Sequence, residues 1–255
     1  MDDPVAGVLS DEDRESVQLA FGVDSAQVVR DHIISHALAA IAALGSEDLI
    51  FFGGTALART LLPALRLSED IDLIAVRHRD EAAERIERSI TRSFRRTLGA
   101  ATFTPSLRET RGSVPSILEA RATRVQIQLL SATGRPPWPT EVVSIEQRYR
   151  DAPAAALRVL TPPAFVAAKL SAWADRAAPR DLYDLWALAE AGLFTEEAAH
   201  LFARHGPYSD IRRVPFSHLP TPVQWERALG HQGRLRTTPQ NAAAVVASAL
   251  AALPR

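Results

Sequence analysis

The chain has 255 residues, a formal net charge of −1 and no cysteine. This length can form one large domain or two small ones with a buried core. The lack of cysteine excludes disulfides, thiolate metal sites and cysteine nucleophiles. The near-neutral charge requires any nucleic-acid surface to be a local patch. The start of the chain is acidic rather than signal-like and no apolar run reaches about 18 residues, so we expect a cytoplasmic protein.

The first 24 residues are acidic and weakly periodic, which is typical of a loose leader or of a short helix capped by Ser10. A long helix is then expected from Asp24 or Ser25 to about Leu44, because apolar residues recur at helical spacing and Gly45 is suited to end it.

Residues 49–62 indicate a strand, a tight turn and a helix. The apolar run at 49–52 predicts a buried strand, and Gly53-Gly54 before Thr55 predicts the turn. The helix that begins at Thr55 is expected to end before Pro63. Backbone N–H groups at such a turn can hold the phosphates of a nucleoside triphosphate.

Two carboxylates follow at the start of the next expected strand, 71–76. Asp70 and Asp72 are two residues apart, so their side chains point to the same face and can bind one Mg²⁺. A lone Gly-Gly pair is usually an ordinary turn, and Asp-Ile-Asp is often a solvated strand edge. In this order and at this spacing, the turn and the carboxylates together indicate nucleotidyl transfer.

The rest of the chain passes from mixed to helical structure. We expect an amphipathic helix over 79–98, a half-buried strand over 124–130 and another strand over 142–145. Pro153 and Thr161-Pro162-Pro163 mark the start of a helical half. Its helices are expected over 162–175, 179–191, 195–205, 222–229 and 239–253.

Lys169 is the only lysine among the 29 basic residues of the chain. Codon usage in a GC-rich genome can by itself produce such an arginine bias. In that case Lys169 would be an ordinary surface lysine whose side chain extends along the edge of an apolar helix face. The alternative is a site where a compact ammonium contacts phosphate and the planar fork of arginine does not fit.

Several blocks of the sequence resemble the AbiEii/AbiGii-type nucleotidyltransferase toxins, including the mycobacterial MenT proteins. The blocks are VRDH (29–32), LIFFGGTAL (49–57), RLSEDIDL (66–73), Lys169 and RDLYDL (180–185). The resemblance implies an α/β (α+β) polymerase-β-like nucleotidyltransferase fold, with a mixed sheet and a helical C-terminal half. From the order of the expected elements along the chain we expect a leader (1–24), a nucleotidyltransferase domain (25–150) and a helical domain (151–255).

The same resemblance implies an enzyme of the metal-dependent nucleotidyltransferase type. It would use a nucleoside triphosphate with Mg²⁺ (or Mn²⁺) and transfer a nucleotide to RNA. In the MenT group the acceptor is the 3′ end of tRNA, and the transfer blocks translation. A cognate antitoxin would be the protein partner.

The expected site draws on both halves of the chain. Ser68 is either an ordinary loop hydroxyl or, as its match to a family position implies, a contact to nucleotide phosphate. Asp181 is either an acidic residue of a helix's first turn or, by the resemblance, an active-site group paired with Lys169. The expected catalytic residues are Asp70, Lys169, Asp181 and Ser68, and the expected metal ligands are Asp70 and Asp72. The expected nucleotide-binding residues are Gly53, Gly54, Thr55, Arg59, Arg66, Ser68 and Lys169.

One feature departs from the family pattern. Many nucleotidyltransferases of this fold carry a third carboxylate on a later strand, where this chain has Gln126 and Gln128. Either one metal ion suffices, or Asp181 supplies the missing charge, or the enzyme is slow. Two other functions therefore stay open: nucleotide transfer to a small molecule or a protein, and a non-catalytic nucleotide-binding partner protein.

Overall fold

The computed structural model describes residues 4–45 and 47–254, which form two units. The first unit contains the described residues of 1–135 together with 141–159, and the second contains 136–140 and those from 160 onward. Within the described residues, no helix has both the length and the apolar character needed to cross a membrane.

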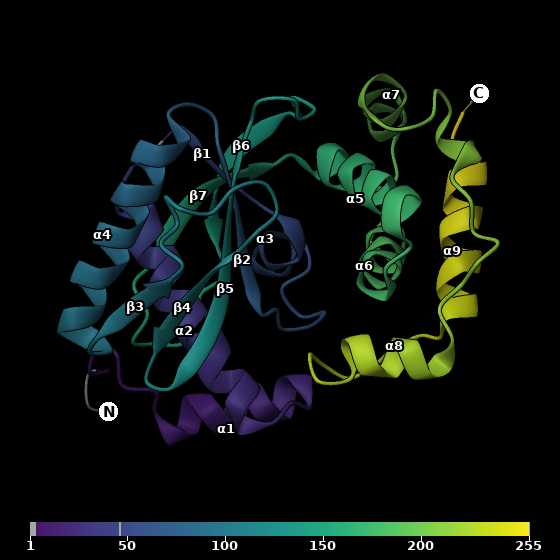
Figure 1. The fold of residues 1–255 in the computed structure, drawn as a ribbon. Coiled ribbons are helices and arrows are strands. Elements are labelled where there is room, and N and C mark those ends of the chain that lie inside the picture. The colour runs from purple at the N-terminus through teal and green to yellow at the C-terminus, as the bar shows by residue number, and fades with distance from the viewer. Residues whose placement is uncertain (1–3, 46, 255) are drawn as a thin grey trace. The chain divides into compact units, whose positions relative to one another are not determined.

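A mixed sheet of seven strands forms the centre of the first unit (Figure 1). In their order across the sheet, the strands are β3 (Ala101–Thr104), β4 (Ser116–Ala120), β5 (Thr123–Ser131), β2 (Asp70–Ala75), β1 (Leu49–Phe52), β7 (Ala155–Leu160) and β6 (Thr140–Ile145). Strand β1 is antiparallel to β2 and parallel to β7, while β2 is parallel to β5. The expected α/β fold with a mixed sheet is confirmed.

The register of β1 against β2 positions the candidate site. Phe52, the last residue of β1, lies opposite Asp72, near the start of β2. The turn that follows β1 therefore meets the carboxylate end of β2. Burial explains this register, because Phe51, Ile71 and Leu73 are all inside the core, and a slip by one residue would turn them outward.

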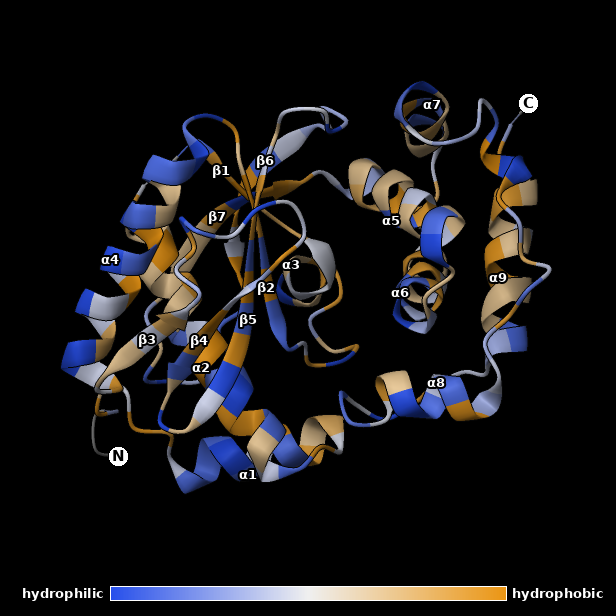
Figure 2. Ribbon diagram, in the orientation of Figure 1, coloured by the Kyte–Doolittle hydropathy of each residue, from blue (hydrophilic) through white to orange (hydrophobic). Residues whose placement is uncertain are grey.

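The helices of the first unit are α1 (Asp11–Phe21), α2 (Ser25–Ala42), α3 (Gly53–Arg59) and α4 (Arg79–Thr97). Local chemistry explains where the first two begin, since the Ser10 and Asp24 side chains accept hydrogen bonds from N–H groups in the first turns of α1 and α2. Helices α2 and α4 pack against each other and both contact β5 (Figure 1). The blue and orange stretches along α4 in Figure 2 reflect its amphipathic sequence.

The second unit is helical. It contains α5 (Pro162–Arg176), α6 (Pro179–Glu190), α7 (Glu196–His205), the short η1 (Ile211–Arg213), α8 (Pro222–Leu229) and α9 (Pro239–Ala252). Four of these helices begin with proline, whose fixed φ suits the first turn. Helix α6 packs against α5, α8 and α9, and α9 is coloured mostly as hydrophobic in Figure 2.

Most expected elements are present within a few residues of their predicted ends. Helix α3 differs at both ends, because it begins at Gly53 rather than Thr55 and ends at Arg59, three residues before the expected end. Strand β7 is absent from the sequence-based prediction, because its alanine-rich start favours a helix. In the structure this segment pairs with β1 through Phe51 and Val159, so tertiary pairing overrides local propensity.

Candidate active site

Gly53 and Gly54 directly follow β1 and form the start of the first turn of α3, at a point that side chains would obstruct. Gly53 has a φ of +79°, and a Cβ atom built on it would lie 2.3 Å from Asp72 Oδ2. A Cβ on Gly54 would lie 2.7 Å from Arg66 Nη2. The missing side chains therefore allow a carboxylate and a guanidinium to lie directly against the turn.

Three hydroxyl and cationic side chains surround this turn. Thr55 is buried, donates a hydrogen bond from Oγ1 to the backbone carbonyl of Asp70, and lies 2.7 Å from Ser68 Oγ. Ser68 and Arg66 are also buried. Arg66 donates a hydrogen bond to the carbonyl of Leu67 at 3.2 Å. The structure thus brings together the expected residues at 53–55, 66 and 68.

Asp70 and Asp72 alternate with the buried Ile71 on β2 and are themselves half-buried. Because residues two apart on a strand share a face, both carboxylates lie on the side that meets the turn. Mg²⁺ prefers one or two carboxylates together with substrate phosphates. The pair fits this ion, because the space left by the absent Gly53 side chain holds the Asp72 carboxylate.

The neighbouring strand carries amides at the positions opposite the two carboxylates. In the parallel pairing of β2 and β5, Asp70 is aligned with Gln126 and Asp72 with Gln128. The Gln128 amide donates a hydrogen bond to the Ser113 carbonyl at 2.6 Å. A third carboxylate on β5 is therefore replaced by neutral groups at this point of the sheet.

Arg59 lies apart from the turn, at the C-terminal end of α3. Its guanidinium is buried and forms an ion pair of 2.8 Å with Asp31 Oδ1 on α2. It also donates a hydrogen bond to the Glu146 carbonyl at 2.8 Å. These contacts join α3 to α2 through Arg59, and its contact with phosphate stays a prediction.

Asp31 is shared by several buried groups. Tyr149 Oη donates to Asp31 Oδ2 at 3.0 Å, and an Arg148 guanidinium nitrogen lies 3.6 Å from the same oxygen. Burial, with repulsion from Arg59, lowers the pKa of Arg148 to about 10, although Asp31 opposes this shift. Burial and the adjacent Asp31 carboxylate raise the pKa of Tyr149. Both groups thus keep their protons at neutral pH.

The second unit holds its own charged cluster. Lys169 Nζ on α5 lies 3.2 Å from Asp181 Oδ1 and 2.6 Å from Asp184 Oδ2, both on α6. Arg176 contacts Asp181 through two nitrogens, at 2.7 and 3.0 Å. All but Arg176 are buried. The expected pairing of Lys169 with Asp181 is present.

The electrostatics of Asp181 follow from this arrangement. Burial acts to raise the pKa of the Asp181 carboxyl, but Lys169 and Arg176 together hold it below its usual value. Two members of the cluster, Asp184 and Arg176, were not predicted as site residues. The spacing of two acids three apart on one helix was a usable signal for Asp184.

The first unit thus combines a mixed sheet, a two-glycine turn and two aligned carboxylates, which together define a nucleotidyltransferase fold. Comparison with known proteins agrees. The sequence profile of the nucleotidyl transferase AbiEii toxins of type IV toxin–antitoxin systems matches residues 36–247. The chain belongs to this family of nucleotidyltransferase toxins.

Solved structures share the fold at low sequence identity. MenT4, a nucleotidyltransferase toxin from Mycobacterium tuberculosis H37Rv, has a TM-score of 0.69 and 19% identity, over 93% of this chain and 88% of that one. A protein from H. pylori assigned as a nucleotidyltransferase has a TM-score of 0.54 and 14% identity, over 90% of this chain and 95% of that one. A search of curated proteins found no match.

Proposed function

We propose that this protein transfers a nucleotide from a nucleoside triphosphate to RNA, at the 3′ acceptor end of tRNA, and so blocks translation as a toxin. The observation that carries the proposal is the position of the Asp70 and Asp72 carboxylates beside the Gly53-Gly54 turn. An antitoxin would be its partner, in keeping with the family. A tRNA acceptor would place the reaction in the cytoplasm.

Each group at the turn has a role in this proposal. Asp70 and Asp72 would hold Mg²⁺, which when bound neutralises charge on the phosphate oxygens. The backbone N–H groups of Gly53, Gly54 and Thr55 would donate hydrogen bonds to the β- and γ-phosphates. Arg66 would add a charge-assisted hydrogen bond to phosphate from its place against Gly54.

Ser68 would contact nucleotide phosphate, and its hydroxyl is oriented by Thr55 at 2.7 Å. In the second unit, Lys169 would supply a point charge to the reaction. Asp181 and Asp184 would orient its ammonium through their contacts at 3.2 and 2.6 Å. These assignments rest on the local geometry of each unit and on the family.

A basic groove in the first unit supports RNA as the acceptor. It has a volume of about 730 Å³, with alanines of α2 along one side. Four exposed arginines of α4 line the other side, and its lining residues include no carboxylate. These arginines are Arg85, Arg88, Arg92 and Arg96. A surface of one sign of charge attracts a phosphate backbone, which a small-molecule acceptor does not need.

The test is incubation of the full chain with each α-labelled nucleoside triphosphate, Mg²⁺ and total RNA, followed by electrophoresis. We expect label in the tRNA band. Asp70→Asn and Asp72→Asn should each reduce it by on the order of 10²-fold or more, because each removes charge that stabilises the transition state. Glu119→Gln, which changes an exposed carboxylate on the same sheet, is the matched control. Equal labelling by both aspartate variants and the control would reject the site.

A non-catalytic nucleotide-binding protein is the second candidate, favoured by the alignment of Gln126 and Gln128 with the two carboxylates. The same purified chain can be used to distinguish this candidate from the enzyme. Saturable binding of a nucleoside triphosphate without label in RNA, protein or a small acceptor would establish this candidate in place of the enzyme.

A further inference from the structure

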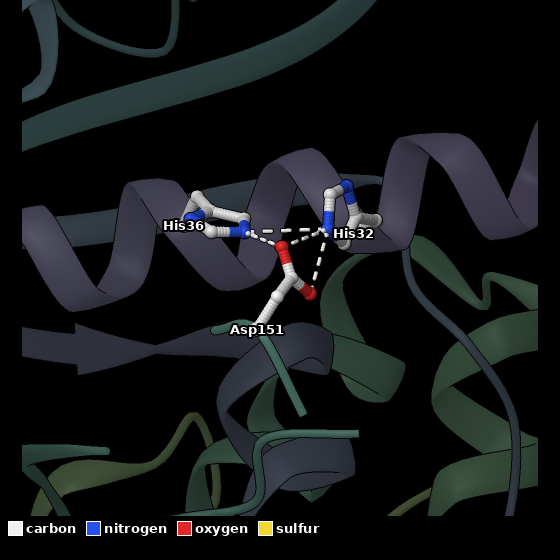
Figure 3. Close-up of side chains that lie close together, drawn as sticks. All are labelled: His32, His36 and Asp151. Carbon is white, nitrogen blue, oxygen red and sulfur yellow. Dashed lines mark hydrogen bonds and ion pairs between the residues drawn. The ribbon is translucent and has the colours of Figure 1, made fainter. Parts of the chain in front are cut away.

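A buried cluster of three metal-ligating side chains lies in the first unit, apart from the two carboxylates of the turn. His32 and His36 are four residues apart on α2, so their rings lie on one face of the helix. Asp151 comes from the segment between β6 and β7. Their side chains are 2%, 1% and 1% exposed, and Figure 3 shows both rings directed at the carboxylate.

The separation of the two imidazole nitrogens matches that of a metal site, while the nitrogen–oxygen separations are also ordinary hydrogen-bond distances. The two Nε2 atoms are 3.3 Å apart, and each is 2.9 Å from Asp151 Oδ2. Ligand atoms bound tetrahedrally to Zn²⁺ at about 2.0–2.1 Å are themselves about 3.3 Å apart. Imidazole nitrogen and carboxylate oxygen are ordinary ligands for Zn²⁺ and for similar divalent transition metals.

Hydrogen bonds alone satisfy this arrangement in one protonation pattern. A neutral imidazole carries one N–H, and a carboxylate only accepts. With Asp151 as a carboxylate, both rings must carry hydrogen on Nε2 to donate to it, and the two Nε2 atoms, 3.3 Å apart, then make no hydrogen bond to each other. If either Nε2 is bare, its lone pair faces Asp151 Oδ2 at 2.9 Å. A cation accepts all three lone pairs at once.

The negative charge of the buried Asp151 carboxylate also favours a bound cation. A buried carboxylate is unfavourable unless a positive group accompanies it. The ion pairs that Asp151 makes within the described chain are to His32 and His36, which are charged only when protonated. From these observations we propose that His32, His36 and Asp151 bind one divalent transition-metal ion of the Zn²⁺ class.

The location of the cluster indicates a structural role. Asp151 Oδ2 also accepts a hydrogen bond from the Gly7 N–H at 2.9 Å, so the cluster links the chain before α1 to α2. The ring of His32 meets that of Tyr149 edge-on, with centroids 5.0 Å apart. Tyr149 in turn binds Asp31, the partner of Arg59 on α3. A bound metal would fasten α2 to residues 149–151.

The test uses the full chain, with any affinity tag removed, in an Asp70→Asn/Asp72→Asn background so that metal bound at the turn is not counted. After dialysis against a chelator, Zn²⁺ or Co²⁺ alone is titrated in. We expect about one metal ion per chain by elemental analysis. Co²⁺ should give the visible absorption of a four-coordinate site, and Zn²⁺ should raise the midpoint of thermal unfolding.

His36→Gln and Asp151→Asn should each weaken Zn²⁺ binding at least about 10-fold and abolish the thermal shift. His200→Gln, an exposed histidine on α7, should bind metal as the parent does. If a ligand variant fails to fold, the parent decides the question. A folded parent that binds no Zn²⁺ or Co²⁺ and shows no thermal shift would overturn the proposal, whatever the outcome for nucleotide transfer.

Discussion

Gly53 combines two constraints that disfavour any side chain at this position. Its φ of +79° is unfavourable for side chains, and a Cβ atom would lie 2.3 Å from Asp72 Oδ2. Gly134 separates these effects, because it has a φ of +75° and no heavy atom within 4 Å of its built Cβ.

We therefore expect Gly53→Ala to reduce nucleotide transfer by on the order of 10²-fold, because it displaces a carboxylate proposed to hold Mg²⁺. Gly134→Ala should cost about 1–2 kcal/mol of unfolding free energy from backbone strain while transfer is retained. Transfer assays and urea titrations of both variants check this. Equal transfer by the two would show that the Asp72 position does not matter.

Lys169 is held more tightly than a surface lysine. It is 8% exposed, and its ammonium lies between two buried carboxylates. A guanidinium is larger and planar, so it cannot occupy the same point between them. Arg176 also forms an ion pair with Asp181, but its side chain is 61% exposed. The reverse substitution, Arg176→Lys, is therefore a matched control.

We expect Lys169→Arg to lose nearly as much transfer activity as Lys169→Ala, a decrease of about 10-fold or more, while Arg176→Lys stays near the parent. Initial rates at saturating nucleotide, with circular dichroism as a check on folding, provide the measurement. Full activity of Lys169→Arg would return Lys169 to the status of an ordinary helix-edge residue.

At the scale of elements, the pairing of α5 with α6 depends on charge as well as on packing. Asp181 is 1% exposed, and its folded-state pKa lies below the usual value because Lys169 and Arg176 outweigh burial. A depressed pKa means that the unfolded chain takes up the proton first as pH falls. The stabilisation is thus complete above the usual aspartate pKa of about 3.9 and is lost as pH falls through the lower folded value.

We predict that Asp181→Asn lowers the unfolding free energy of the second unit by about 3 kcal/mol at pH 7, because Lys169 loses a buried partner. The difference from the parent should shrink below about pH 4. Tryptophan fluorescence is a selective probe, since all four tryptophans belong to this unit. A difference that does not change between pH 7 and pH 3 would contradict the assigned role of the ion pairs.

Helix α2 shows how an element can look simpler in sequence than in structure. Its apolar positions predicted one buried face, but polar residues are buried too. These residues are Gln27, Asp31, His32, Ser35 and His36. Their recurrence at spacings of four and five along the helix was a visible signal. Partners on distant segments, Arg59, Tyr149 and Asp151, explain the burial of Asp31 and of the two histidines.

At the scale of the whole molecule, a net charge of −1 conceals a local concentration of positive charge. The groove between α2 and α4 is lined by arginines from four successive turns of α4. Glutamates and aspartates elsewhere balance the total, so bulk composition alone could not reveal this surface.

We expect Arg88→Ala/Arg92→Ala to weaken tRNA binding and to lower the slope of log affinity against log salt by about 2, because two phosphate contacts are lost. Binding of nucleoside triphosphate should be unchanged. Arg204→Ala, an exposed arginine on α7, is the control. Salt-dependent filter binding measures both slopes, and equal slopes for the parent and the double variant would exclude the groove as an RNA surface.

Features that depend on a few neighbouring residues could be predicted from the amino-acid sequence. Local sterics explain the glycines that follow the apolar run of β1, and strand periodicity explains why Asp70 and Asp72 share a face. Capping explains the helix starts at Ser10 and Asp24. The family resemblance adds that these parts belong to a nucleotidyltransferase, as the family match shows.

Contacts between groups far apart in the chain could not be predicted in this way and are seen in the folded structure. Four contacts of the site and its surroundings are of this kind. They are the alignment of Gln126 with Asp70, the ion pair of Lys169 with Asp184, the ion pair of Arg59 with Asp31 and the contact of His32 with Asp151. Such contacts depend on strand register and on which polar groups must be paired once they are buried. The spacing of residues along the chain does not predict strand register or the partners of buried polar groups, because both depend on which distant segment packs against them.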